Sequence, residues 1–283
     1  MLGIIGGTGI YQLEGLEVKQ KHQIDTPFGA PSAPIVQGVM SDRDLLFLPR
    51  HGVRHELLPS EVNYRANVWA LKKLGVTQLI GLSAVGSLQA EIEPGDLSLP
   101  DQYFDFVKGD RQKSFFGNGL AAHVSTAEPT CKSLADALER AATTVDIKLH
   151  RNKTYGCVDG PRLGTRAESF FLRGAAGCDL VGMTNVPEVF LAREAQLCYT
   201  TIAIATDYDC WLDDPAQHVS VEQVIARYGA SLEKAKKVLT AYIAQAQSCS
   251  EVCGCRKSLA SAVLTPKEAL DESQLQLLEV LSA

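Results

Sequence analysis

Short runs of β-forming residues alternate with helical patterns along most of this chain. This alternation is typical of an α/β fold with a substantially parallel sheet, because each helix carries the chain back between neighbouring strands. We expect strands at residues 2–5, 33–39, 44–48, 78–82, 96–99, 180–182 and 199–206. We expect helices that begin near residues 64, 131, 166, 187 and 221, and a last one after residue 266. The pattern predicts a single domain over residues 1–283.

Several helix ends carry their own signals. Gly75 follows a helical pattern and suits a left-handed C-terminal cap. Pro187 fits a first helical position, with Thr184 or Asn185 as the N-cap. Residues 220–223, Ser-Val-Glu-Gln, match a capping box before a long amphipathic helix.

The charge pattern and the apolar runs argue against several functional classes. The 283 residues include 27 basic and 33 acidic side chains, a net charge of −6, without a basic block. Nucleic acid is therefore not an expected partner. No run approaches the roughly 20 apolar residues of a membrane span. The first residues lack a basic segment and glycines soon interrupt their apolar run, so we expect no signal peptide, no membrane association and a cytoplasmic location.

Eight cysteines are many for such a chain, and they fall into two groups. Cysteines 131, 157, 178, 198 and 210 are scattered through apolar surroundings, where a free thiol packs like a small hydrophobe. Cysteines 249, 253 and 255 are too few for a tetrahedral zinc site without a distant partner. A redox or disulfide role stays open for this trio, and structural thiols in a reducing compartment are favoured. The six histidines show no metal spacing, so we predict no metal.

A glycine-rich loop, Gly6-Gly7-Thr8-Gly9, follows the first predicted strand. Glycines let successive backbone N–H groups approach an anion, and the Thr8 hydroxyl can join them. The loop lacks the Lys-Ser/Thr ending of a Walker motif, and Gln12 stands where a dinucleotide fingerprint has its third glycine. A phosphate site and a plain tight turn are both compatible with it.

Two further strand ends carry residues suited to an anion. Arg50-His51 directly follow a predicted strand, and ligands of open α/β sheets bind at the carboxyl ends of strands. Ser83-Ala84 follow another strand, where a small hydroxyl residue can complete a phosphate site. Taken separately, the first is better explained as a solvated basic loop, and the second is a weak signal that tight packing of small residues also explains.

Two carboxylates follow the strand predicted at residues 199–206. Asp207 and Asp209 are spaced i, i+2, so they point to one side if the backbone stays extended. Close carboxylates resist ionising together, and burial raises the pKa of at least one of them further. A carboxylic acid kept protonated near neutral pH can act as a general acid. The alternative is a solvated loop.

The ordered set of motifs resembles the purine nucleoside phosphorylases, and within them the branch that acts on 5′-methylthioadenosine. The similarity runs from about residue 2 to about residue 237. Besides the glycine-rich loop and the Arg50-His51 pair, it rests on residues 59–67 (PSEVNYRAN), 160–162 (GPR), 183–188 (MTNVPE) and 205–211 (ATDYDCW).

The resemblance implies a single α/β domain around a large mixed central sheet flanked by helices, assembled as a homotrimer or a multiple of one. It also implies the reaction, in which phosphate displaces a purine from a nucleoside and gives a pentose 1-phosphate. Inorganic phosphate is then a co-substrate, and no metal or organic cofactor is expected. The C-terminal tail, residues 248–283, lies mostly beyond the similarity and is a candidate contact with a neighbouring subunit.

Site roles follow from the resemblance position by position. The phosphate would be held by Thr8, Arg50, His51, Ser83, Ala84 and Thr184. Asp207 would protonate or hydrogen-bond N7 of the purine, and Asp209 would assist at the exocyclic amine. Met183 would lie against the ribose. The methylthio pocket would be bordered by Val221 and Val224, with His123 from a neighbouring subunit.

Substrate choice is expected to depend mainly on Asp207. Branches that prefer 6-oxopurines typically carry Asn there, and often a Glu where Gly164 stands, so both positions favour adenine. Leu163 replaces a Phe that faces the base, and Gly182 replaces an Asn before the Met183 position; both occur in relatives that act on methylthioinosine or 6-oxopurine nucleosides. We therefore order the candidates as a methylthioadenosine phosphorylase, then a broader purine nucleoside or methylthioinosine phosphorylase. A non-catalytic nucleoside-binding protein is the alternative from another class.

Overall fold

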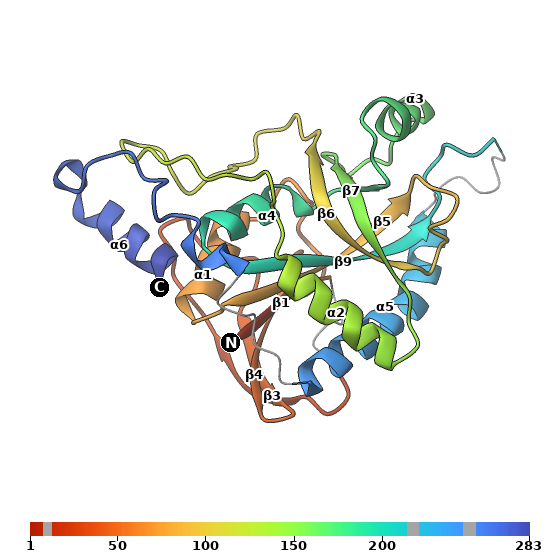
Figure 1. Cartoon of the computed structure of the whole chain (residues 1–283), viewed down its shortest axis with the longest axis horizontal. Helices are drawn as coiled ribbons and strands as arrows, with labels where there is room; N and C mark the ends of the chain where they lie inside the picture. The colour runs from red at the N-terminus through yellow and green to blue at the C-terminus, as the bar shows by residue number, and fades with distance from the viewer. Residues whose placement is uncertain (8–12, 214–220, 246–252) are drawn as a thin grey trace.

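The computed structural model describes residues 1–7, 13–213, 221–245 and 253–283, without the side chains of residues 221–227 and 230 (Figure 1). Within these residues the strands form one sheet and belong to nine segments: β1 (Leu2–Gly6), β2 (Glu17–His22), β3 (Ile35–Met40), β4 (Arg43–Pro49), β5 (Gln78–Ser87), β6 (Leu97–Asp105), β7 (Leu149–Cys157), β8 (Leu180–Gly182) and β9 (Cys198–Asp207). The α-helices are α1 (Tyr64–Lys73), α2 (Lys132–Thr144), α3 (Arg166–Phe170), α4 (Asn185–Glu194), α5 (Val221–Ala244) and α6 (Glu272–Ser282).

The sheet is mixed, as predicted, and one half of it closes on itself. Its order is β2-β3-β4-β1-β5-β8-β7-β6-β9, and β9 also pairs with β5. The strands β1, β4, β5 and β9 are mutually parallel, whereas β8 runs antiparallel to β5 and β6 antiparallel to β9. Strands β5, β8, β7, β6 and β9 therefore form a closed ring, from which β1 to β4 extend as an open sheet.

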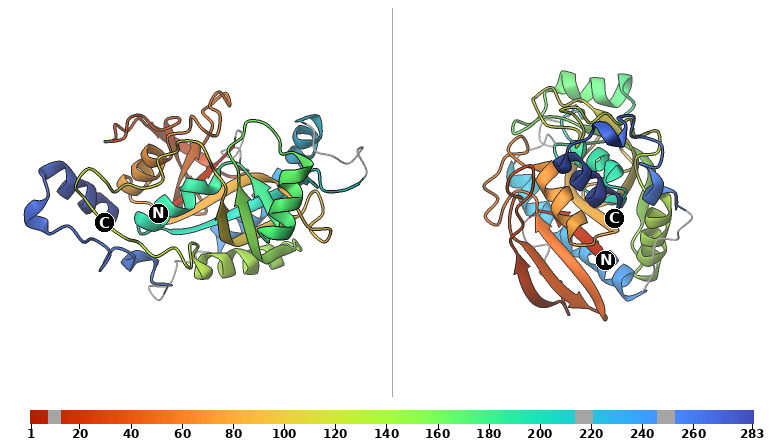
Figure 2. Two further views of the ribbon diagram at one scale, coloured as in Figure 1. Left: turned by 90° about the horizontal axis from the view of Figure 1, so that it is seen from above. Right: turned by 90° about the vertical axis from the view of Figure 1, so that its left-hand side faces the viewer.

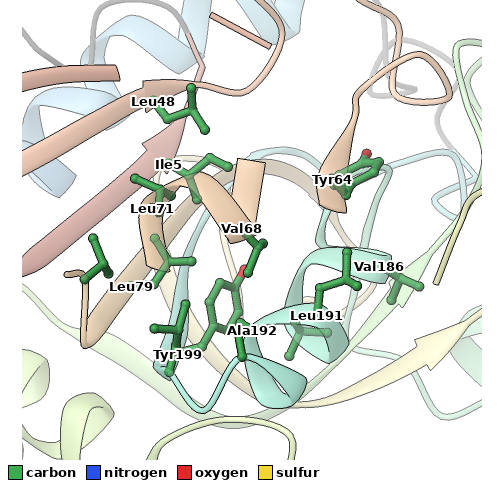
Figure 3. Packing of buried hydrophobic residues seen from close by; sticks show 14 of the residues in the cluster. Ile5, Leu48, Tyr64, Val68, Leu71, Leu79, Val186, Leu191, Ala192 and Tyr199 are labelled. Atoms are coloured by element: carbon green, nitrogen blue, oxygen red, sulfur yellow. The ribbon is translucent and has the colours of Figure 1, made fainter. Parts of the chain in front are cut away.

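Helices cover both faces of the sheet (Figure 1). Successive side chains of a strand point to opposite faces, so Ile4 packs in the cluster with α2 and α5, and Ile5 in the cluster with α1, α4 and α6. Figure 3 shows Val68 of α1 and Leu191 of α4 in the second cluster. The long apolar runs of the strands thus reflect burial on both sides.

The helix ends follow the predicted signals only in part, and α1 has a cap that was not predicted. Asn63 caps α1 by accepting a hydrogen bond from the N–H of Ala66 at 3.2 Å, and Gly75 takes a φ of +87° just beyond its end. In α4, Val186 still has extended dihedrals, so the helical turns begin at Pro187, as predicted, but Thr184, one of the two expected N-caps, makes no side-chain cap hydrogen bond. Helix α5 begins at Val221, but the capping box expected at residues 220–223 lies outside the described side chains.

The C-terminal residues 253–283 lie along the rest of the domain (Figure 2). Val263 pairs with Ala122 in the extended segment before α2, and a capping box formed by Asp271 and Gln274 starts α6. Leu281 joins the core cluster beside α1. None of the helices in the described part of the chain has the length and apolar character needed to cross a membrane.

Candidate active site

The predicted motifs meet at one edge of the sheet. Because β1, β4, β5 and β9 are parallel, their carboxyl ends lie side by side. These ends carry Gly6-Gly7, Arg50-His51 and Asp207. Ser83-Ala84 lie inside β5, which continues to Ser87, so the expectation that they follow a strand ending at residue 82 is wrong. Thr8 lies outside the described residues.

Arg50 is fixed at this edge by a buried ion pair. Its Nε and Nη2 donate to the two carboxylate oxygens of Glu188 at 2.6 and 2.7 Å. Nη1 donates to the carbonyl of Leu82 at 2.8 Å and Nη2 to that of Ile5 at 3.3 Å. Although burial lowers the pKa of Arg50, the Glu188 carboxylate raises it above its usual value, so the guanidinium stays charged. These four bonds to described residues leave one of its five N–H groups for an anion.

Glu188 was missed as a site residue, because the sequence pattern marks it only as an acidic residue in the first turn of a helix. Its side chain is fully buried and accepts a third hydrogen bond from the hydroxyl of Tyr199 at 2.8 Å. Its role is to hold Arg50 in a fixed orientation.

His51 is neutral at physiological pH in this environment. Burial and the neighbouring Arg50 lower the pKa of His51 to about 4. Its Nδ1 lies 2.9 Å from the carbonyl oxygen of Leu57, and its ring stacks on His55 with centroids 4.5 Å apart. A carbonyl only accepts hydrogen bonds, so we assign the proton to Nδ1, which makes Nε2 an acceptor.

Three hydroxyl groups meet beside the Arg50 clamp. The Ser83 oxygen lies 3.1 Å from the Tyr155 hydroxyl and 3.4 Å from the Thr184 hydroxyl. The predicted pair Ser83 and Thr184 is thus brought together, and Ala84 is exposed next to them on β5. Tyr155 was not predicted, because it lies on β7, a strand that the sequence pattern did not indicate. Burial raises the pKa of Tyr155, so its hydroxyl is neutral.

Gly182 and Tyr155 form a complementary pair. A Cβ at position 182 would overlap with the hydroxyl oxygen of Tyr155, so the tyrosine fills the space that a side chain at 182 would need. The Tyr155 ring therefore explains why position 182 has no side chain in this fold.

We expect Gly182→Ala to displace Tyr155 and to lower the free energy of unfolding by about 1–3 kcal/mol, the usual cost of overpacking. Because Tyr155 also contacts Ser83, which the resemblance assigns to a phosphate site, the KM for phosphate is expected to rise. Urea unfolding and phosphate saturation curves measure both effects. Gly174→Ala is the matched control, because a Cβ there meets no atom within 4 Å. Equal stability and KM for the two variants would contradict this account.

The two carboxylates do not lie on one extended strand. Strand β9 ends at Asp207, and Asp209 has a φ of +52°, so the extended arrangement that we considered is wrong. The β5–β9 register shifts between Val85 and Gly86, which leaves Thr206 as the extra residue of a bulge. Bulges next to active sites re-aim side chains, and this one sets the direction of Asp207.

Asp207 is 2% exposed and is held by short hydrogen bonds. Its Oδ1 accepts from the N–H of Asp209 at 2.8 Å and its Oδ2 from the Thr206 hydroxyl at 2.7 Å. Both carboxyl-bearing residues pack against Gly86, where a Cβ would lie 3.0 Å from the Asp207 Oδ1. Burial raises the pKa of Asp209, which agrees with the expectation that one carboxyl of the pair is hard to ionise.

The loop before α3 borders this carboxylate pair. The Cys210 thiol lies 3.6 Å from the carbonyl of Gly164, and Leu163 is 37% exposed in the same loop. The loop is stiffened by Arg162, whose two bonds to Glu168 measure 2.6 and 2.8 Å. These bonds hold the pKa of Glu168 at about 2. Met183, half-buried, packs on the turn that begins this loop, and its sulfur occupies the space beside Gly160.

Three predicted residues are not placed with this group. The side chains of Val221 and Val224 lie outside the described part, although Tyr228 of the same helix reaches within 3.3 Å of a Cβ position on Gly7. His123 is exposed, and its N–H donates to the carbonyl of Ala262 at 2.9 Å. Its proposed role in a neighbouring subunit stays a prediction.

Comparison with known proteins decides the family. Residues 1–244 match the model of the phosphorylase superfamily. The chain belongs to the phosphorylase superfamily. This superfamily member is 43% identical over 281 residues to an S-methyl-5′-thioadenosine phosphorylase of Geobacter sulfurreducens, with 99% of this chain and 97% of the relative covered. A relative of the same name in Nitrosopumilus maritimus is 44% identical over 261 residues, covering 92% and 97%.

Solved structures agree with the assignment of this chain to the phosphorylase superfamily. A methylthioadenosine phosphorylase from an Antarctic soil metagenomic library superimposes with a TM-score of 0.92 at 42% identity, covering 99% of this chain and 98% of that one. An adenosine/methylthioadenosine phosphorylase variant of Schistosoma mansoni, in complex with methylthioadenosine, gives 0.85 at 36% identity, covering 95% and 99%. The predicted fold, a single domain with a mixed sheet flanked by helices, is thereby confirmed.

Proposed function

We propose that this phosphorylase cleaves the N-glycosidic bond of 5′-methylthioadenosine with phosphate, giving adenine and 5-methylthioribose 1-phosphate. The observation that carries the proposal is the meeting of a clamped arginine, paired hydroxyl groups and a buried carboxylate at one sheet edge. Relatives named for this activity, and a solved relative in complex with methylthioadenosine, support the choice of substrate.

The phosphate would be held by Thr8, Arg50, His51, Ser83, Ala84 and Thr184. Hydrogen phosphate carries one O–H, and the neutral His51 offers Nε2 as its acceptor. Arg50 supplies a charge whose position Glu188 fixes. Breaking the glycosidic bond builds positive charge on the ribose, and a phosphate anchored beside C1′ stabilises that charge before it bonds to the same carbon.

The leaving purine takes the electron pair of the broken bond. A proton from Asp207 at N7 lets adenine depart as a neutral molecule, and Asp209 is the proposed contact of the exocyclic amine. Burial already disfavours the charged form of Asp209. Met183 would lie on the ribose. Val221, Val224 and a His123 from a neighbouring subunit would enclose the methylthio group, which needs a homotrimer or a multiple of one.

The proposal needs phosphate as a co-substrate and no other cofactor at this site, in a cytoplasmic enzyme. A broader purine nucleoside or methylthioinosine phosphorylase is the second candidate, because Leu163 and Gly182 depart from the methylthioadenosine branch. The exposure of Leu163 favours a base site with room on that side.

The deciding experiment compares kcat/KM for methylthioadenosine, methylthioinosine, adenosine and inosine, with and without phosphate. We expect methylthioadenosine to give the highest value and every turnover to require phosphate. Equal base release without phosphate would identify a hydrolase. Binding of methylthioadenosine with no turnover at any pH would identify a non-catalytic nucleoside-binding protein.

A further inference from the structure

Four cysteines that are far apart in the sequence come together at the end of the sheet remote from Asp207. Cys131 precedes α2, Cys198 begins β9, and Cys253 and Cys255 follow α5. Their sulfur atoms all lie within 4.8 Å of one another, and those of Cys198 and Cys253 are 3.4 Å apart. We call these four residues the thiol cluster. Cys253 and Cys255 lacked distant partners in the sequence, and the fold supplies them as Cys131 and Cys198. Cys249, the third cysteine of the tail trio, lies outside the described residues.

Backbone contacts hold the thiol cluster in place. The N–H of Cys131 donates to the carbonyl of Tyr199 at 2.7 Å, and the N–H of Cys198 donates to the carbonyl of Thr77 at 3.0 Å. Gly254 has a φ of +70°, a conformation that suits glycine and turns the chain between Cys253 and Cys255 so that both thiols reach the same point.

The size and burial of the thiol cluster suit a tetrahedral thiophilic cation. With Zn–S bonds of about 2.3 Å, four tetrahedral sulfur ligands lie about 3.8 Å apart. Cys131, Cys198 and Cys255 are at most 3% exposed and Cys253 is half-buried. Four protein ligands and no open position are the pattern of structural zinc sites.

The charges around the thiol cluster fit an anionic metal–thiolate group. Zn²⁺ with four thiolates carries a net charge of −2. Lys72 of α1 is 3% exposed, and its ammonium has no hydrogen-bond partner among the described residues. Burial and Arg256 lower the pKa of Lys72 to about 8, whereas the Cys198 side chain acts in the opposite direction, so these groups share one electrostatic environment. Two disulfides would be neutral and would leave this buried ammonium uncompensated.

We propose that Cys131, Cys198, Cys253 and Cys255 bind one structural Zn²⁺, which joins the C-terminal residues 253–283 to α2 and β9. Metal binding by thiolates releases protons and stabilises the folded chain. The metal takes no part in the reaction at the opposite end of the strands, so this inference stands apart from the proposed function.

The test measures the zinc content of the full chain, expressed with added zinc and purified under reducing conditions without chelators. We expect about one zinc per chain, and its loss in Cys253→Ser/Cys255→Ser. Cys178→Ala is the control, because Cys178 is buried like Cys255 but lies outside the thiol cluster, and this variant should keep its zinc. Replacement by Co²⁺ should give the intense visible absorption of a tetrahedral thiolate site.

Two results overturn the proposal. The first is wild-type protein without zinc that also fails to give the Co²⁺ spectrum, with its thiols free to react with an alkylating reagent. The second is a non-reduced peptide map in which these cysteines are linked as disulfides. If the double variant does not fold, the zinc content and the Co²⁺ spectrum of the wild-type protein decide the question.

Discussion

Replacing Asp207 with alanine is expected to lower kcat/KM for methylthioadenosine by about 10²–10⁴-fold, the usual contribution of a general acid. The loss should fall mainly on kcat, because the proposed role of the carboxyl is to act on the leaving purine in the transition state. The proposed phosphate ligands lie on other segments of the chain, so the KM for phosphate should change little. Initial rates of adenine release over a range of both substrates measure these quantities.

Asp207→Asn tests whether the same residue distinguishes 6-aminopurines from 6-oxopurines. An amide can pair with a ring carbonyl, so we expect the preference to shift toward inosine and methylthioinosine while adenine release falls. Asp213→Asn is the matched control, because the Asp213 carboxylate is 99% exposed, and it should behave like the wild type. Unchanged discrimination in Asp207→Asn would show that this residue does not distinguish the bases.

Glu188→Gln is expected to lower the free energy of unfolding by about 3–5 kcal/mol, because it leaves the charge of Arg50 buried without its partner. Arg50 would also lose the bidentate bonds that orient it, so the KM for phosphate should rise together with the loss of stability. Urea unfolding at neutral pH gives the first quantity and phosphate saturation the second.

Glu91→Gln provides the comparison for this effect. Glu91 pairs with Lys153 at 3.3 Å, but its side chain is 60% exposed, and exposed ion pairs contribute about 0–1 kcal/mol. A Glu188 variant no less stable than the Glu91 variant would mean that water or another group replaces the lost partner. An unchanged KM for phosphate would remove Arg50 from the proposed anion site.

Continuous apolar runs made most strands predictable, and two strands lacked such a run. Residues 45–48 and 78–82 are buried on both faces, and both became strands. Strand β2, with the sequence EVKQKH, lies at the exposed edge of the sheet, so its polar side chains meet solvent. In β7 the middle residues are only partly buried, which removes the apolar signal there.

The site was predictable where a residue follows a strand, and not where its role depends on a contact across the fold. Arg50 directly follows β4 and Asp207 ends β9, and these strands proved parallel, whereas Ser83 lies inside β5, which runs on to Ser87. Glu188 gains its role only when the fold brings α4 to Arg50, the residue after β4, and Tyr155 only because position 182 has no side chain. The direction of Asp207 depends on a bulge, and a strand's sequence alone does not reveal where its partner's register shifts.

The closed ring of five strands has a consequence for how the chain folds. Gln78 pairs with Cys198, so β5 meets β9 only after a loop of 120 residues has closed. Closing such a loop costs chain entropy before the stabilising contacts between the two strands can form. Pairing between strands far apart in the sequence is therefore slow. The open sheet of β1 to β4 depends on nearer pairings and can form earlier. We therefore expect Ser83 and Asp207 to come together late in folding, after the open sheet has formed.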